Sequence, residues 1–466
     1  MHPGTAAGKK RVVSVAIVLF TRDLRVHDNP TLAAAVRGSD RVVPLFVLDS
    51  AILASGYNRP NRASFLSEAL RDLDASLRHR GAGLVVRSGD VVDETAAVAA
   101  DVGADVVHVS GDASGYAQRR QERLARRLTA EGRRLHVHGE TLFVVPPGAI
   151  TPVGKDHMAV FTPYHRRWQN YPRREAAPAP RVLRMPRVRM GRIPDATTIC
   201  PGTTSPHLAV GGESTARSRL SAWLSSGIGG YAAGHDAVAA EATSRLSPYL
   251  HFGALSPLEA ANRAGDRAGV GSDAFVRQLA WRDFHHQVLA ARPDAVRRDY
   301  RPRGDRWQHS DEELAAWREG RTGYPIVDAG MRQLALEGWM HNRARLITAH
   351  FLTKTLYIDW RLGAAHFLDL LVDGDVANNT MNWQWCAGTG TDSRFNRSYN
   401  VTTQARRHDP NGAYVRRYVE ELRDVDDDRV HEPWLLPAAR LDALGYPLPI
   451  VDQNEARDRM RAVRRS

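Results

Sequence analysis

Residues 274–290 bring together side chains that suit an unstacked nucleic-acid base. Gln278, Trp281, Arg282 and His285 recur at intervals of three and four residues, so a helix would place them on one side. An indole beside a guanidinium offers the stacking that an exposed base requires. The segment also contains an apolar stripe, so we predict a helix over 274–290. A half-buried tryptophan on an ordinary exposed helix face is the alternative interpretation.

A second polar segment lies between Asp373 and Gln384. It reads Asp-Gly-Asp-Val-Ala-Asn-Asn-Thr-Met-Asn-Trp-Gln and is rich in carboxylate and amide groups. We interpret it as a polar loop whose oxygens could accept hydrogen bonds from a ribityl chain, a sugar or a ring N–H. A calcium loop is the rival interpretation, but the required Asp spacing and the Glu at the twelfth position are missing.

The segment 243–247, Thr-Ser-Arg-Leu-Ser, offers hydroxyl groups, backbone N–H groups and one guanidinium. Such a set suits a pyrophosphate, although a pentapeptide alone does not identify a ligand. Tryptophan is also concentrated in this half of the chain, and core packing is the alternative interpretation for each one. Seven of the ten lie between residues 281 and 385: Trp281, Trp307, Trp317, Trp339, Trp360, Trp383 and Trp385.

The elements that must position these groups belong to two regions, an α/β region in the first third of the chain and a helical region after residue 213. In the first third, short apolar runs alternate with amphipathic stretches, which predicts a doubly wound parallel α/β sheet that binds ligands at the carboxyl ends of its strands. No Gly-x-Gly-x-x-Gly follows the first strand, which argues against a usual dinucleotide site. The predicted strands are 12–21, 41–49, 83–89, 104–111 and 134–139, and the predicted helices are 29–38, 61–81, 91–102 and 115–132.

Seven prolines between residues 172 and 206 predict a long irregular connection. The pattern after Glu213 is helical, and proline or glycine separates most segments. We therefore expect an α/β domain over 12–145, a linker over 146–212 and an all-α domain over 213–460. The predicted helices of the last part are 216–226, 257–264, 274–290, 311–319, 325–337, 342–356, 363–372 and 412–423.

Composition narrows the class of protein. The 466 residues carry a formal net charge of +12, which favours a polyanionic partner such as nucleic acid, although only four of the 64 basic residues are lysines and a codon bias toward arginine is the alternative. Two cysteines cannot build a disulfide framework or a four-cysteine zinc site, so we expect no metal and a cytoplasmic location. No apolar run is long enough for a membrane span, and no secretory signal is evident.

The motifs together resemble the DNA photolyase and cryptochrome family over nearly the whole chain. Within that family, the Trp-Met-His-Asn-Arg segment is similar to bacterial class I cyclobutane pyrimidine dimer photolyases, whereas animal relatives typically carry His-His there and plant cryptochromes His-Asp. The resemblance rests on Thr21-Arg22-Asp23-Leu24-Arg25 with Asp28-Asn29-Pro30, Thr243 to Ser247, Gly323-Tyr324-Pro325-Ile326-Val327-Asp328-Ala329, Gly338-Trp339-Met340-His341-Asn342-Arg343, and Asp373-Gly374-Asp375 with Trp383-Gln384-Trp385.

The resemblance implies a U-shaped FAD, active in its reduced anionic form, in the helical domain. Asn379 would face flavin N5, and Trp383, Trp360 and Trp307 would carry an electron from the surface to photoexcited oxidised flavin. Gln278 is implied as a catalytic contact to the lesion. The implied cofactor-binding residues are Tyr231, Thr243, Ser244, Arg245, Leu246, Ser247, Phe275, Gln278, Arg282, Asn342, Asp373, Asp375 and Asn379.

The implied activity is that of a deoxyribodipyrimidine photo-lyase, which splits cyclobutane pyrimidine dimers in ultraviolet-damaged DNA by electron transfer from excited reduced FAD. The lesion would be flipped out of the duplex between Trp281 and Trp385. The implied DNA-binding residues are Gln278, Trp281, Asn342, Arg343, Leu346, Trp385, Arg397 and Gln404.

Four residues depart from the family pattern. Gln278 stands where many class I enzymes have a glutamate, Leu346 replaces a common methionine, Phe275 a common tryptophan, and Val401 follows Asn400 in place of proline. A blue-light photoreceptor of the cryptochrome type and a photolyase for (6-4) photoproducts are therefore alternative functions. A nucleotide-binding protein without photochemistry fits the α/β half alone and is disfavoured by the flavin loop and the tryptophans.

Tyr116-Ala117-Gln118-Arg119-Arg120 places arginines where folate-binding relatives carry an Asn-Glu pair. The resemblance therefore favours 8-hydroxy-5-deazaflavin as the antenna chromophore in the α/β domain, with methenyltetrahydrofolate or an empty antenna site as alternatives. We expect a monomer without an obligate protein partner or a membrane association.

Overall fold

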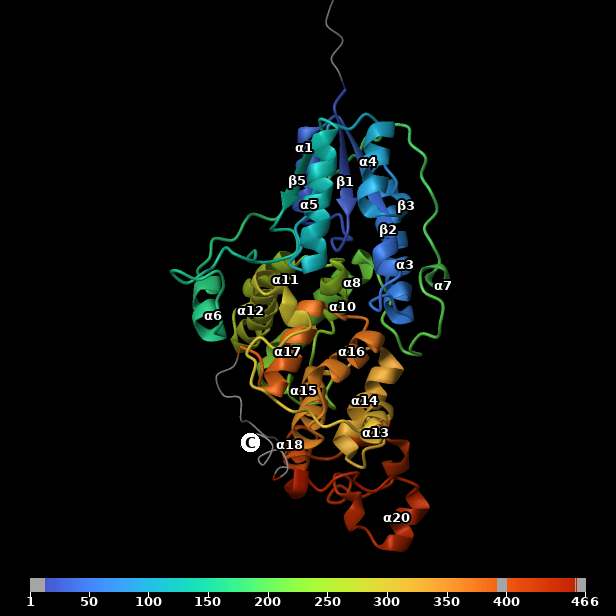
Figure 1. The fold of residues 1–466 in the computed structure, drawn as a ribbon, viewed down its shortest axis with the longest axis vertical. Helices are drawn as coiled ribbons and strands as arrows, with labels where there is room; N and C mark the ends of the chain where they lie inside the picture. Colours follow the sequence, from blue (N-terminus) through green and yellow to red (C-terminus); the bar gives the residue numbers. More distant parts are fainter. Residues whose placement is uncertain (1–12, 392–399, 457, 459–466) are drawn as a thin grey trace, which may run out of the picture.

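In the computed structural model, which describes residues 13–391, 400–456 and 458, a parallel sheet lies at one end and a helical assembly at the other (Figure 1). The strand order is β3-β2-β1-β4-β5, and every neighbouring pair is parallel. At the centre of the sheet, Ile17 of β1 lies opposite Val43 of β2 and Val107 of β4. The strands are β1 (Val15–Phe20), β2 (Arg41–Asp49), β3 (Val85–Gly89), β4 (Val106–Ser110) and β5 (Arg134–His138).

Helices cover both faces of this sheet, as the apolar strands predict. Alternate residues of β1 point to opposite faces: Ala16 and Val18 pack with α1 and α3, whereas Ile17 and Leu19 pack with α4 and α5. The Asn29 side chain caps α1 by accepting from the Leu32 N–H at 3.0 Å, which fixes where that helix begins. The helices are α1 (Pro30–Gly38), α2 (Ser50–Leu53), α3 (Pro60–Arg78), α4 (Val91–Asp101) and α5 (Gly115–Ala130).

The strand order reverses between β1 and β4, which is where a doubly wound sheet usually binds ligands. Here the Thr21 and Ser110 hydroxyl groups lie 3.2 Å apart across this point. The Arg22 guanidinium lies beside them, 3.2 Å from Asp112 and 2.6 Å from Asp375 of the helical part. The carboxyl edge of the sheet is therefore joined to the helical part by the ion pair between Arg22 and Asp375.

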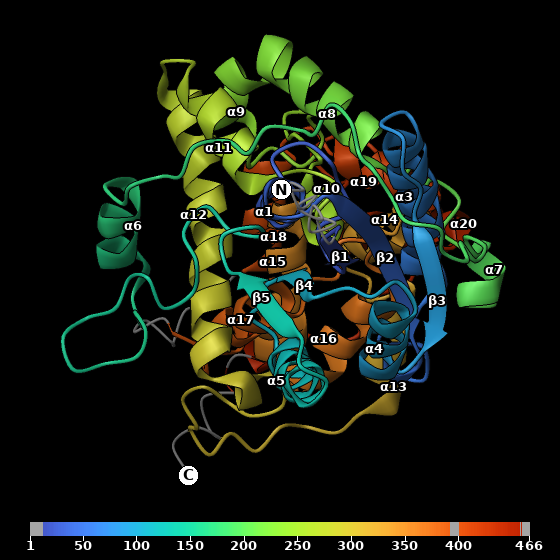
Figure 2. The same ribbon diagram turned by 90° about the horizontal axis from the view of Figure 1, so that it is seen from above.

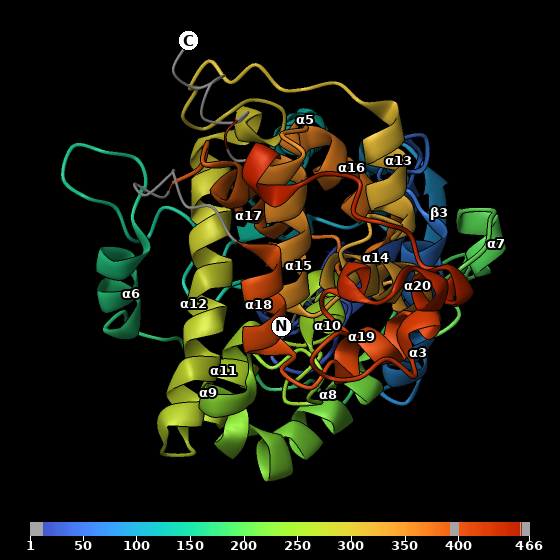
Figure 3. The ribbon, with the colours of Figure 1, turned by 90° about the horizontal axis from the view of Figure 1, so that it is seen from below.

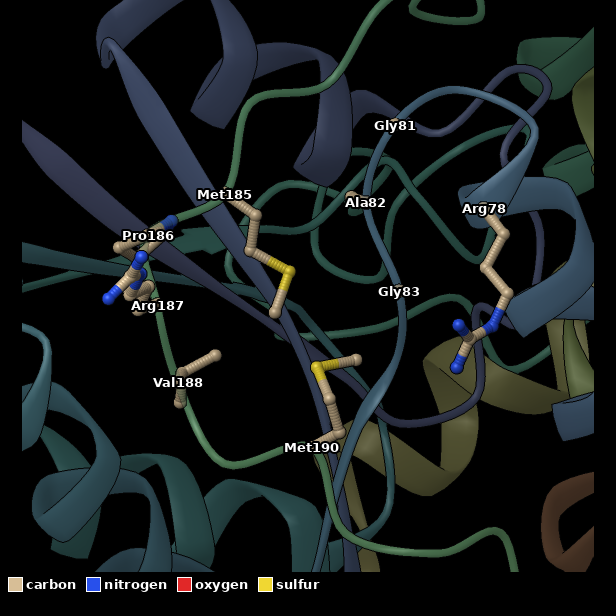
Figure 4. Close-up of a pocket in the computed structure, with 9 residues that line it drawn as sticks. All are labelled: Arg78, Gly81, Ala82, Gly83, Met185, Pro186, Arg187, Val188 and Met190. Atoms are coloured by element: carbon tan, nitrogen blue, oxygen red, sulfur yellow. The ribbon is translucent and has the colours of Figure 1, made fainter.

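The linker runs along the β3 edge of the sheet. The Val86 N–H donates to the Met190 carbonyl oxygen at 2.7 Å, so the linker satisfies part of the otherwise open edge. Gly191 has φ 79°, and a Cβ there would overlap the Val86 carbonyl oxygen. Figure 4 shows Met185 and Met190 reaching from the linker toward residues 81–83 over a surface hollow. The linker contains α6 (Phe161–Gln169) and α7 (Ala196–Ile199).

The rest of the described chain is helical, with two π-helical turns and several 3-10 turns. Two apolar cores support it, one shared with the sheet and one formed by its later helices. The helices are α8 (Glu213–Ala222), α9 (Tyr231–Gly234), α10 (Ser247–Phe252), α11 (Pro257–Gly265), α12 (Val270–Ala291), α13 (Asp311–Glu319), α14 (Pro325–Glu337), α15 (Asn342–His350), α16 (Trp360–Leu370), α17 (Val376–Ala387), α18 (Val401–His408), α19 (Ala413–Tyr418) and α20 (Ala438–Leu444).

Two sequence-based interpretations were wrong in detail. Residues 373–384 are not a loop throughout, because Asp375 accepts from the Asn378 N–H at 2.8 Å and begins α17. The helix predicted over 412–423 ends at Tyr418 and is followed by a 3-10 turn, Glu420–Leu422. Among the described residues, no helix combines the length and the apolar character that a membrane crossing requires.

Candidate functional site

A cavity of about 490 Å³ lies within the helical part, bounded chiefly by α12, α15 and α17. Figure 3 shows α17 between α12 and α15, and α17 packs against both neighbours. The walls combine apolar and aromatic side chains with carboxylate, amide, hydroxyl and guanidinium groups. Such a mixture is typical of a site for an organic cofactor or ligand.

The cavity collects most of the residues predicted to bind a cofactor or DNA, which come from five helices and from the segments before α10 and α17. Those that line it are Tyr231, Ser244, Leu246, Ser247, Phe275, Gln278, Trp281, Arg282, Asn342, Arg343, Leu346, Asp373, Asp375, Asn379, Trp383 and Trp385.

Other predicted residues lie elsewhere. Thr243 and Arg245 are not part of the cavity wall, and the Arg245 guanidinium instead lies 2.7 Å from Glu337 and 4.4 Å from the centre of the Trp339 ring. Gln404 lies on α18 without lining the cavity. Arg397 falls outside the described residues.

Two buried aspartates in the wall are paired with arginines. Asp373 lies 2.8 Å from Arg345, which is three residues beyond Asn342 on α15 and was not singled out from the sequence. Asp375 lies 2.6 Å from Arg22, and its other contacts include His286 at 3.2 Å. Although burial alone would raise it, the neighbouring His286 ring and the Arg22 guanidinium hold the pKa of Asp375 well below its usual value.

Asp375 also organises the first turn of α17. Its second oxygen accepts from both the backbone and the side-chain N–H groups of Asn378, at 2.8 and 2.9 Å. The Asn378 side-chain oxygen lies 3.0 Å from Nδ1 of His285, which also lines the cavity. Burial lowers the pKa of His285 to about 4, so the ring is neutral at pH 7 and its Nδ1–H can donate to Asn378.

Asn379 follows on the same turn. Its side-chain N–H donates to the Ala364 carbonyl oxygen of α16 at 3.0 Å. Because the nitrogen is used in this way, the side-chain oxygen is the group that remains available to a ligand in the cavity.

The mouth of the cavity carries two tryptophans and two exposed amides. Gln278 and Asn342 are both exposed, while Trp281 and Trp385 are half-buried. Arg343 stands on the same rim, but both oxygens of Asp236 accept from its guanidinium at 2.7 Å. The rim therefore offers flat rings and neutral hydrogen-bonding groups together with a compensated positive charge.

The three tryptophans predicted to relay electrons differ in exposure. Trp383 is 2% exposed and reaches the cavity wall, Trp360 is 1% exposed, and Trp307 is half-buried. A Cβ at Gly363 would overlap the indole of Trp383, so this glycine permits the packing of α16 against that ring. Trp360 donates to Asp299 at 2.9 Å, and all three belong to or pack against one apolar core.

Comparison with known proteins bears on what occupies this cavity. Residues 16–182 match the family model described as DNA photolyase, and residues 275–466 match the FAD binding domain of DNA photolyase. The chain is 54% identical over 454 residues to a deoxyribodipyrimidine photo-lyase from Streptomyces griseus, covering 97% of this chain and 99% of that protein. It belongs to the DNA photolyase and cryptochrome family.

Solved structures agree with this assignment. A class III photolyase from Agrobacterium tumefaciens superposes with a TM-score of 0.90 at 32% identity, covering 98% of each chain. A cryptochrome from Synechocystis gives the same TM-score at 28% identity, with 98% of this chain and 100% of that chain covered. The family assignment of the sequence is therefore confirmed, while neither similarity singles out the class I subgroup.

The residues present fit FAD. Ser244 and Ser247 offer hydroxyl groups, Asn379 offers its amide oxygen, and the buried Asp373 and Asp375 can accept hydrogen bonds from ring or ribose donors. Several polar wall residues were missed by the sequence interpretation, and of those named here only Arg345 lies on a helix that the sequence predicted. They include Asp236, His251, Arg345 and Asn378.

Proposed function

We propose that the chain repairs cyclobutane pyrimidine dimers in ultraviolet-damaged DNA by light-driven electron transfer from reduced, anionic FAD. The observation that carries this proposal is that Trp281 and Trp385 at the mouth share one cavity with Asn379 and Asp373 in the wall. A dimer flipped out of the duplex would then stand next to the flavin. The 54% identity to a deoxyribodipyrimidine photo-lyase supports the same enzyme class.

When bound, FAD supplies a light-absorbing one-electron donor. The residues that would hold it are Ser244, Leu246 and Ser247 on the phosphate side, and Arg282, Asp373 and Asn379 beside its rings. Asn379 presents an oxygen acceptor without net charge, because its nitrogen is held by Ala364. Arg345 neutralises Asp373, so the wall can accept an anionic ring at a lower electrostatic cost.

The lesion would be held by stacking at the mouth. Trp281 and Trp385 provide flat apolar faces, while Gln278 and Asn342 can donate hydrogen bonds to pyrimidine carbonyl groups. A distorted, weakly paired dimer costs less to flip than intact bases, which favours damaged sites. Gln278 differs from the glutamate of many class I enzymes in carrying no proton that it could release, so its role here is hydrogen bonding.

Two further roles complete the proposal. Trp383, Trp360 and Trp307 would supply electrons that reduce oxidised flavin in the light, which is supported by the burial of Trp383 and Trp360 and by the partial exposure of Trp307. An 8-hydroxy-5-deazaflavin would serve as the antenna, with methenyltetrahydrofolate or no antenna as the alternatives. Arg119 and Arg120 support the first choice, since they stand where folate-binding relatives carry an Asn-Glu pair. We further propose that the protein acts in the cytoplasm as a monomer.

One assay distinguishes repair of cyclobutane dimers from repair of (6-4) photoproducts and from a photoreceptor function. Reduced protein is illuminated with an oligonucleotide containing either a cyclobutane dimer or a (6-4) photoproduct, and absorbance at the thymine band is followed. We expect recovery with the dimer only. Recovery with the (6-4) photoproduct alone would reassign the substrate. Photoreduction without any repair would favour a photoreceptor, a possibility raised by the similarity to the Synechocystis cryptochrome.

A further inference from the structure

The indole of Trp281 at the cavity mouth is stacked on a residue from the linker. The Phe161 and Trp281 rings are 7° from parallel, with centroids 3.5 Å apart. Phe161 is 6% exposed and does not line the cavity, whereas Trp281 does. One face of the indole is therefore covered by Phe161, and a ligand can stack only on the opposite face.

Helix α6 is held firmly enough to fix this stack. Phe161, Tyr164 and Trp168 recur at three and four residues and form its buried face. The Trp168 indole N–H donates to the buried Asp283 of α12 at 2.9 Å, and the Tyr164 ring lies 5.4 Å from that of Phe284. Figures 2 and 3 show α6 on the outer side of α12, away from α17.

Further groups restrain the two rings. The Arg277 guanidinium lies 5.2 Å from the centre of the Phe161 ring, and the His165 ring is stacked with it at 5.3 Å and 22°. Phe284 meets the Trp281 ring edge-on at 5.6 Å. The indole plane is thus set by α6 and α12 together before any DNA binds, which reduces the entropy lost when a base stacks on it.

We propose that Phe161 is a positioning residue for lesion recognition, which fixes the plane of Trp281 so that its free face receives the damaged pyrimidine pair. This inference rests on the proposed function, since it takes Trp281 as the residue that stacks on the lesion. The linker then contributes to substrate discrimination although no residue of 146–212 lines the cavity.

The test compares Phe161→Leu, which keeps apolar volume but removes the flat ring, with Phe161→Tyr, which keeps the ring. Phe65→Leu is the matched control, because Phe65 is also buried and stacked, on Phe252 at 4.7 Å, but lies on α3. Binding to a duplex with one thymine dimer and to the same intact duplex is measured in the dark on protein with FAD bound.

We expect Phe161→Leu to lower the ratio of affinities for damaged and intact duplex by about three- to tenfold, the amount that an aromatic pair adds beyond burial. Phe161→Tyr and Phe65→Leu should retain the wild-type ratio. In a Trp281→Ala background, Phe161→Leu should have no further effect on the ratio. The salt dependence of binding should be unchanged throughout, because no charge is altered.

The inference would be overturned if Phe161→Leu kept the wild-type ratio of affinities for damaged and intact duplex. It would also be overturned if Phe161→Tyr or Phe65→Leu lowered this ratio as much as Phe161→Leu does. FAD absorbance and the urea midpoint establish that each protein is folded. If Phe161→Leu does not retain FAD, Phe161→Met replaces it, and the same outcomes apply. Absence of lesion preference in the wild type would instead contradict the proposed function itself.

Discussion

Arg22, at the carboxyl end of β1, forms a 2.6 Å ion pair with Asp375, which caps α17 in the wall of the cavity. The two residues are 353 positions apart. The Asp375 side chain is 7% exposed, so its charge depends on partners and not on water. The position of α17, and with it of Asn378 and Asn379, therefore depends on a residue of the α/β part.

Substitution Arg22→Gln should weaken both the fold and cofactor retention. Removing one partner leaves the buried Asp375 carboxylate undercompensated, and we expect a loss of about 2–3 kcal/mol in the free energy of unfolding, with weaker FAD binding. Urea unfolding and FAD release on dialysis measure the two effects. Arg59→Gln is the control, because its 2.8 Å pair with Asp369 is 36% and 44% exposed, and should cost less than about 1 kcal/mol.

Trp383→Phe should block photoreduction of oxidised flavin and spare repair by chemically reduced protein. The physical reason is that the buried Trp383 reaches the cavity wall and would pass electrons to the flavin, whereas the lesion would receive its electron from the flavin directly. Flavin absorbance under blue light, with an external reductant withheld, tests the first part. Photoreduction of Trp383→Phe at the wild-type rate would show that Trp383 only packs in the core and does not carry electrons.

The stability of the protein should fall on acidification between about pH 6.5 and pH 4, in part because of His285. Burial lowers the pKa of His285 to about 4 from an ordinary 6.5, against the hydrogen bond of Asn378, while His286 lowers it further and Asp375 opposes this. The unfolded chain therefore binds the proton first as the pH falls, and acidification favours unfolding.

Substitution His285→Gln removes this contribution. We expect the loss of unfolding free energy between pH 7 and pH 5 to be smaller by about 2 kcal/mol in the variant than in the wild type. Urea titrations at the two pH values measure it. His309→Gln, at a side chain that is 83% exposed, should leave the pH dependence unchanged. Equal pH dependence in all three proteins would contradict the assignment to His285.

How far the sequence predicts this molecule depends on the range of the interactions. Strands β1, β2 and β4 are buried on both faces, so their apolar runs identify them directly. Asn29 and Asp90 indicate where the helices that they cap begin. Helix α17 was misinterpreted as a loop because the carboxylates before it and its own amide side chains obscure the apolar face that includes Met381 and Trp383. Periodicity cannot detect a helix whose buried face is itself partly polar.

For the site as well, local features could be predicted from the sequence and long-range contacts could not. The family motifs predicted many of the residues that line the cavity. The ion pair of Arg22 with Asp375 could not be inferred, because the two residues are 353 positions apart. The stack of Phe161 on Trp281 also joins residues far apart in sequence, and no helix was predicted for α6, which lies in the predicted linker. Local pattern therefore identified the residue types of the site, while the contacts that orient them required the fold.

The final prediction concerns Arg343 and the salt dependence of DNA binding. Its guanidinium donates to both oxygens of Asp236 at 2.7 Å, so a DNA phosphate must compete with this carboxylate. Asp236→Asn should free the guanidinium and remove a negative charge from the rim. Each phosphate contact contributes about 0.9 to the slope of log affinity against log salt, so the slope should steepen by about one unit.

The ratio of affinities for damaged and intact duplex should stay constant in Asp236→Asn, because phosphate contacts position DNA without reading the lesion. Asp195→Asn is the matched control, since it makes the same charge change at the exposed pair with Arg71 beside α7. It should leave the slope unchanged. A slope that does not steepen in Asp236→Asn, or one that steepens equally in Asp195→Asn, would remove Arg343 from the DNA surface and attribute the effect to net charge alone.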